Sequence, residues 1–127
     1  MTILLDSHAI VWYLAGDRRM SDAARSAIER DPEVCVSPVS AFEIANKHRL
    51  GKWPAVEVLA RDFVSAIDGY QWLKLPLSLE HAHLAGRFPA DHRDPFDRML
   101  AAQSQVEDIP LVTADPVFRA FGTRTLW

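Results

Sequence analysis

Short apolar runs alternate with longer helical patterns along this chain of 127 residues. This alternation is typical of β-α units around a parallel sheet, so it predicts an α/β fold with about five strands, in one domain spanning residues 1–127. The predicted strands are Thr2–Asp6, Glu33–Ser37, Gln71–Leu75, Ile109–Thr113 and Thr123–Leu126. The predicted helices are Ser7–Ala15, Ser21–Arg30, Val39–Leu50, Val56–Ile67, Leu79–Phe88, Pro95–Glu107 and Pro116–Phe121.

The composition limits what such a chain can do. Hydrophobic residues make up 49% and charged residues 24%, as in an ordinary globular domain. The net charge of −3 counts mildly against a dedicated nucleic-acid binder, which usually carries a basic surplus. The only cysteine, Cys35, forms no intrachain disulfide and fits a reducing compartment. No apolar stretch is long enough to span a bilayer, and Asp6 comes too early for a signal peptide, so we expect a cytoplasmic protein without membrane contact.

Four acidic residues stand where a parallel α/β fold would bring them together: Asp6, Glu43, Asp97 and Asp115. Asp6 and Asp115 close two apolar runs, and ligands of open α/β sheets bind just beyond the carboxyl ends of the strands. Carboxylates converging there repel each other by roughly 4 kcal/mol per pair at about 4 Å. A cation at the centre would offset this repulsion. Oxygen ligands without a His or Cys pattern favour Mg²⁺ or Mn²⁺.

Three of these acidic residues also fit a purely structural role as helix caps. Asp6 and Asp115 each precede a predicted helix, and Asp94 with Asp97 fits a capping box. The prolines that follow Asp94 and Asp115 support both helix starts. We therefore interpret Asp94 as a cap that could also support the residues around a metal.

Glu43 has a structural alternative of its own, an ion pair with Lys47 one helical turn later, worth only a few tenths of a kcal/mol. The phase of the helix favours a functional role, because Glu43 lies on a stripe that should face the protein, where an unpaired carboxylate is costly. The other members of that stripe are Val39, Phe42, Asn46 and Leu50.

Three further residues are candidates for supporting roles. Ser7 and Thr113 flank the predicted site and could hydrogen-bond the carboxylates or a metal-bound water, although helix capping or strand packing explains them equally well. Arg98 neighbours Asp97 and is the better candidate for a contact with substrate phosphate.

Two aromatic residues lie near the predicted site in the sequence. His8 could contact substrate phosphate, but a single histidine at a helix entry is more often structural, and we favour that interpretation. Among the four tryptophans, which we expect to be mostly core or interface anchors, only Trp53 stands where a base could stack.

Four segments, in this order, resemble the signatures of the PIN domain, and more narrowly those of a VapC-type toxin of bacterial type II toxin–antitoxin systems. They are MTILLDSHAIVWYL, SPVSAFEIANKHRLGKW, HRDPFDRMLAAQSQ and PLVTAD. The resemblance implies a three-layer α/β/α fold with a central parallel sheet. It also implies that Asp6, Glu43, Asp97 and Asp115 hold Mg²⁺ or Mn²⁺, that the substrate is RNA, and that a cognate antitoxin inhibits a homodimer.

We therefore interpret the chain as a Mg²⁺-dependent endoribonuclease and toxin. A carboxylate-held metal supplies both an activated water and charge stabilisation, so no Ser, Cys or His nucleophile is required. Two alternatives stay open. One is a non-catalytic PIN-like binding module acting through a protein partner, and the other is a metal-dependent phosphatase acting on small substrates.

Overall fold

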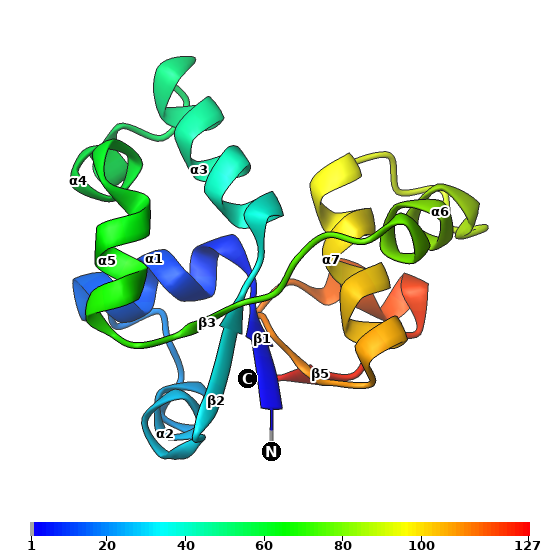
Figure 1. The fold of residues 1–127 in the computed structure, drawn as a ribbon, viewed down its shortest axis with the longest axis horizontal. Helices are drawn as coiled ribbons and strands as arrows, with labels where there is room; N and C mark the ends of the chain where they lie inside the picture. Colours follow the sequence, from blue (N-terminus) through cyan, green and yellow to red (C-terminus); the bar gives the residue numbers. More distant parts are fainter. Residues whose placement is uncertain (1) are drawn as a thin grey trace.

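The computed structural model describes residues 2–127 and contains a five-stranded sheet in the order β3-β2-β1-β4-β5 (Figure 1). Every neighbouring pair of strands is parallel. The strands are β1 (Thr2–Leu5), β2 (Glu33–Val36), β3 (Leu73–Lys74), β4 (Leu111–Val112) and β5 (Thr125–Leu126). The predicted α/β class with a parallel sheet is confirmed.

Helices cover both faces of this sheet (Figure 1). They are α1 (Ser7–Ala15), α2 (Asp22–Arg30), α3 (Pro38–Arg49), α4 (Glu57–Arg61), α5 (Phe63–Gly69), α6 (Leu79–Arg87) and α7 (Pro95–Glu107), with 3₁₀ turns η1 (Pro54–Val56) and η2 (Pro116–Phe121). In Figure 1, α1, α2, α4 and α5 lie on one side, and α6, α7 and η2 lie on the other. Helix α3 begins at the carboxyl end of β2 and contacts both α1 and α7. The result is the expected three-layer arrangement.

Strand β1 shows how the sequence builds two cores, one on each face. Successive side chains of a strand point to opposite faces of a sheet. Ile3 and Leu5 accordingly pack with α1 and α2, whereas Leu4 packs with α7 and η2. All three are fully buried, which explains why the central strand reads as a continuous apolar run.

The predicted helix Val56–Ile67 is wrong as one element. The structure divides it into η1, α4 and α5, and the break between the two α-helices is at Asp62, whose φ of −143° and ψ of 56° leave the helical region. Neither Gly nor Pro marks this position, and the helical spacing of apolar residues continues across it. The sequence pattern therefore gives no sign of the break. In the described part of the chain, no helix is long and apolar enough to cross a membrane.

The prediction for α3 is also partly wrong. Val39 and Glu43 are buried as expected, but Phe42 and Leu50 on the same predicted stripe are 59% and 50% exposed. The helix contacts its neighbours only along part of its circumference and rises beyond the carboxyl edge of the sheet (Figure 1). Its outer end therefore presents apolar side chains to solvent.

Candidate functional site

The predicted acidic residues lie at the carboxyl edge of the sheet, each positioned by a different element. Asp6 follows β1 and caps α1, accepting the backbone N–H three residues on at 2.7 Å. Asp115 follows β4 and caps η2, accepting the N–H two residues on at 3.0 Å. Glu43 lies in α3 and Asp97 in the first turn of α7. Asp6 and Asp115 therefore cap helices and at the same time lie at this edge of the sheet.

Asp6 is the most buried member of this group, with an exposed fraction of 6%. Burial is the largest cause that raises its pKa, to about 7, and the nearby charges of Asp97 and Glu43 raise it further, against hydrogen bonds from Thr113 and a backbone N–H. The pKa of Asp97 is raised to about 6, again mainly by burial, with Asp94 and Glu43 adding to it. Asp6, Glu43 and Asp97 thus lie close enough to repel one another.

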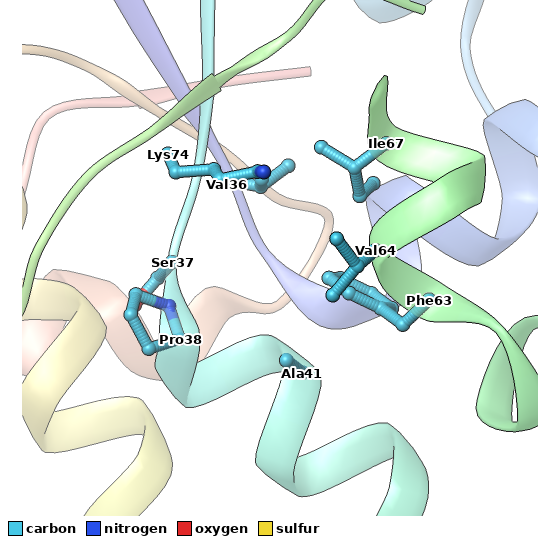
Figure 2. A pocket seen from close by; sticks show the side chains of 8 residues that line it. All are labelled: Val36, Ser37, Pro38, Ala41, Phe63, Val64, Ile67 and Lys74. Carbon is cyan, nitrogen blue, oxygen red and sulfur yellow. The ribbon is translucent and has the colours of Figure 1, made fainter. Parts of the chain in front are cut away.

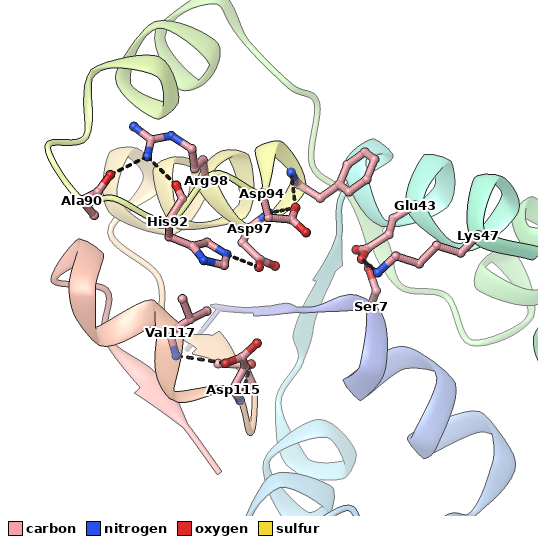
Figure 3. A network of polar contacts seen from close by, with 12 residues as sticks. Ser7, Glu43, Lys47, Ala90, His92, Asp94, Asp97, Arg98, Asp115 and Val117 are labelled. Atoms are coloured by element: carbon pink, nitrogen blue, oxygen red, sulfur yellow. Dashed lines mark hydrogen bonds and ion pairs between the residues drawn. The ribbon is translucent and has the colours of Figure 1, made fainter. Parts of the chain in front are cut away.

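Two partners offset part of this negative charge at Glu43. The Ser7 hydroxyl donates a hydrogen bond to one carboxylate oxygen at 2.6 Å, and the Lys47 ammonium pairs with the other at 2.6 Å (Figure 3). The ion pair that was the structural alternative for Glu43 is therefore present. Lys47 supplies some of the positive charge that convergent carboxylates require.

Asp97 has a partner that sequence reasoning missed. His92 Nε2 lies 2.8 Å from a carboxylate oxygen of Asp97 (Figure 3). The only signal in the sequence was the nearness of His92 to the DPFD segment, five residues before Asp97. Asp94 caps α7 as predicted, accepting the N–H groups of Phe96 at 2.8 Å and Asp97 at 3.2 Å.

Asp115 lies at the rim of the group and is exposed. The Thr113 hydroxyl oxygen accepts the Asp115 N–H at 3.0 Å, and the same side chain hydrogen-bonds Asp6. Thr113 thus links the first and fourth predicted acidic residues. In Figure 3 the carboxylates of Glu43, Asp97 and Asp115 face a common region beyond the end of β1.

The guanidinium of Arg98 forms its hydrogen bonds within the protein. A guanidinium has five N–H donors, and here all five point to backbone carbonyls at 2.6–3.5 Å. Figure 3 shows two of these contacts, those with Ala90 and His92. The acceptors are the carbonyls of Ala85, Gly86, Phe88, Ala90 and His92. The predicted contact between Arg98 and substrate phosphate stays a prediction, and it would compete with these carbonyls for the same donors. Arg98 fastens the end of α6 and the following loop to α7.

The structural role expected for His8 stays a prediction. Its ring is exposed on the first turn of α1. Burial of part of the ring lowers its pKa, as do the charges of Lys47 and Arg19, whereas Glu43 and Asp115 act in the opposite direction. The imidazole therefore lies among the charged groups of the site.

An apolar pocket of about 220 Å³ lies between α3 and α5 (Figure 2). Its walls include Pro38, Phe63 and Ile67, and Lys74 is the one charged residue among those that line it. None of the acidic residues of the site contributes to it. The pocket is therefore separate from the carboxylate group.

The donor set fits a hard divalent cation in its chemistry. Carboxylate oxygens are the ligands that Mg²⁺ prefers, and the raised pKa values of Asp6 and Asp97 indicate negative charge that a cation would stabilise. Within residues 2–127, however, no three His, Cys, Asp or Glu side chains are arranged as a group that could hold a metal ion. A bound cation would compete with Lys47 for Glu43 and with His92 for Asp97.

Comparison with known proteins agrees with this fold. The PIN domain profile matches residues 3–123. Ribonuclease VapC22 of Mycobacterium tuberculosis (strain ATCC 25618 / H37Rv) is 30% identical over 130 residues, which cover 94% of this chain and 91% of that protein. The chain therefore belongs to the PIN domain family, in its branch of VapC-type toxins.

Solved structures show the same fold. A chain of DNA-bound VapBC from Salmonella typhimurium matches with a TM-score of 0.70 and 16% identity, covering 98% of this chain and 96% of that one. A chain of a toxin–antitoxin complex from Klebsiella pneumoniae matches with a TM-score of 0.63 and 16% identity, covering 90% and 87%. At these identities the likeness concerns the architecture.

Proposed function

We propose that this protein is a Mg²⁺-dependent endoribonuclease that acts as the toxin of a toxin–antitoxin pair. The observation that carries the proposal is the approach of Asp6, Glu43 and Asp97, from three different elements, at the carboxyl edge of a parallel sheet. The relationship to Ribonuclease VapC22 supports RNA as the substrate.

In this proposal Asp6, Glu43 and Asp97 hold Mg²⁺, or Mn²⁺ in its place, with Asp115 at the rim, directly or through water. The bound metal would supply an activated water and neutralise charge on the scissile phosphate. The protein contributes orientation. Hydrogen bonds from Ser7 to Glu43 and from Thr113 to Asp6 restrict the carboxylates, and the N–H of Ala9 at the start of α1 restricts Asp6 further.

The test of this proposal is cleavage of RNA by the purified protein with Mg²⁺, with Mn²⁺ and with EDTA. We expect internal cleavage with either cation and none with EDTA, while p-nitrophenyl phosphate stays intact. Full activity in EDTA would contradict the metal. Hydrolysis of the monoester in place of RNA would favour the phosphatase alternative, and inactivity on both substrates would favour the non-catalytic binding module.

We further propose a cytoplasmic homodimer that is inhibited by a cognate antitoxin. The related chains from S. typhimurium and K. pneumoniae were solved in VapBC and toxin–antitoxin assemblies, which supports such a partner. The exposed apolar side chains of Phe42 on α3 and of Leu50 just after it support a protein contact at that helix.

Expression of this protein alone is therefore expected to arrest bacterial growth, and co-expression with the antitoxin encoded beside it should restore growth. Growth curves measure the first effect, and light scattering of the purified protein at micromolar concentration measures the dimer. Normal growth without the antitoxin would contradict the toxin role. A monomer by light scattering would contradict the homodimer alone.

A further inference from the structure

Four aromatic rings form a connected row beside the carboxylates, which we call the aromatic row: Trp53, His8, Trp12 and Trp127. The His8 ring lies 4.6 Å from Trp53 at an interplanar angle of 32°, and 5.4 Å from Trp12. Trp12 continues the row to Trp127 at 5.7 Å. The three indoles are half-buried and pack against the core under α1, whereas the imidazole is exposed. Packing alone explains the indoles but not an exposed ring lying against one of them.

The chain places this row next to the proposed active site. His8 is two residues after Asp6 on the first turn of α1. Trp53 comes four residues after α3, the helix that carries Glu43. Between them the chain turns at Gly51, which has a φ of +74°. The row therefore begins beside the carboxylates and leads away from them along α1.

Cationic side chains lie over two rings of the row. The Arg19 guanidinium is 4.8 Å from the centre of the Trp12 ring, and the Lys47 ammonium is 6.0 Å from that of Trp53. Lys52 precedes Trp53 and is exposed. The net charge is −3, and Arg19 and Lys47 are already paired with Asp17 and Glu43, so contacts with the rings must supply much of the affinity for RNA.

We propose that the aromatic row stacks the bases of a single-stranded segment of the RNA substrate next to the phosphate that is cut. This proposal rests on the ribonuclease function proposed above and specifies its substrate class. Aromatic rings combined with nearby cations bind single strands with little sequence preference, because every base has a π-face. In a duplex the bases are stacked on one another, so they cannot stack on the rings of the aromatic row.

The test uses a fluorescent oligouridylate of about eight nucleotides, a length typical of single-strand sites. Binding is measured by anisotropy in Mg²⁺, in a background carrying Asp6→Asn so that the probe is not cut. Adding His8→Ala should raise the Kd at least about fivefold, the lower end of what loss of one base stack does. His8→Phe, which keeps a ring, should bind like the background, and a duplex probe should bind weakly and ignore both changes.

Tyr70→Ala is the matched control. Tyr70 is another exposed aromatic residue, 49% exposed, and its ring stacks on Trp72 at 4.9 Å just before β3, away from the carboxyl edge. Its removal should leave the Kd unchanged. Quenching of indole fluorescence by the probe is a second measurement in the Asp6→Asn background, and it does not depend on the folding of His8→Ala.

An unchanged Kd in His8→Ala would overturn the aromatic row as a binding surface for RNA, even if the wild type cuts RNA. The same conclusion would follow if His8→Ala weakened binding of the antitoxin but not of the RNA probe. A probe that leaves indole fluorescence unquenched would overturn it as well. Tight, His8-dependent binding by a wild type that never cuts RNA would instead overturn the proposed catalytic function. The two proposals therefore fail separately.

Discussion

Asp6→Asn is expected to lower the rate of RNA cleavage at least about a hundredfold, since loss of groups that merely support a metal ligand already costs about 10- to 100-fold. The physical reason is the loss of the most buried charge in the site. Asparagine still caps α1, because Asn and Asp cap helices about equally well, so the fold should survive. Gel analysis of RNA cleavage in Mg²⁺ measures the effect.

Asp68→Asn is the matched control for this substitution. Asp68 is an exposed carboxylate that pairs with Lys74 at 2.9 Å, outside the group formed by Asp6, Glu43 and Asp97. It should cut RNA at the wild-type rate. If Asp6→Asn also cut at that rate in Mg²⁺, Asp6 would have no place in the active site.

The stability of the metal-free protein is expected to fall as the pH rises. In the folded state burial raises the pKa of Asp6 from 3.8 to about 7, so the folded protein keeps a proton that the unfolded chain releases. The resulting stabilisation is complete below the unfolded pKa and is lost as the pH rises through the folded pKa, between about pH 4 and pH 7. It amounts to at most about 4 kcal/mol for this one residue.

Urea unfolding in EDTA at several pH values measures this loss, and Asp6→Asn identifies its source. Without a titratable group at position 6, the variant should lose less stability over the same pH window and should exceed the wild type at pH 8. Addition of Mg²⁺ should restore the wild type more than the variant, because a cation that binds only the folded state stabilises it. Asp97→Asn should act in the same direction by a smaller amount, since its pKa is raised to about 6.

A different result would support a simple capping role. If Asp6→Asn were less stable than the wild type at pH 8, with or without Mg²⁺, repulsion at Asp6 would not be a feature of the folded protein. Asp68→Asn should follow the wild-type pH profile in both conditions, because that carboxylate is exposed.

The sequence predicted the sheet and its acidic edge because both depend on short-range patterns. Asp6 follows β1 directly and Asp115 comes three residues after β4, and a parallel topology brings the residues after these two strands to the same edge. The bounds of α1 and α7 were predicted to the residue, since Asp6, Asp94 and Pro95 mark where these helices begin.

The remaining details depend on contacts that no local pattern encodes. The break at Asp62 has neither Gly nor Pro, and the exposure of Phe42 follows from where α3 leaves the sheet. Arg98 was expected to contact substrate because it is next to Asp97. Its guanidinium binds carbonyls that only the path of the loop after α6 brings within reach. His8 was expected to be structural because a single histidine at a helix entry usually is, and its contact with Trp53, 45 residues away in sequence, leaves no local signal.

The helix caps of this site restrict how such a chain can lose its activity over evolutionary time. Asp6, Asp94 and Asp115 each accept a backbone N–H at the start of the helix that follows. Alanine or valine at these positions removes the cap together with the charge and costs about 0.5–2 kcal/mol of stability, whereas asparagine or serine keeps the cap. An inactive descendant that stays folded will therefore most readily carry Asn or Ser at these positions. If the proposed function holds, we expect a neutral polar residue at Asp6 or Asp115 in natural variants of this protein to accompany lost catalysis in an intact fold.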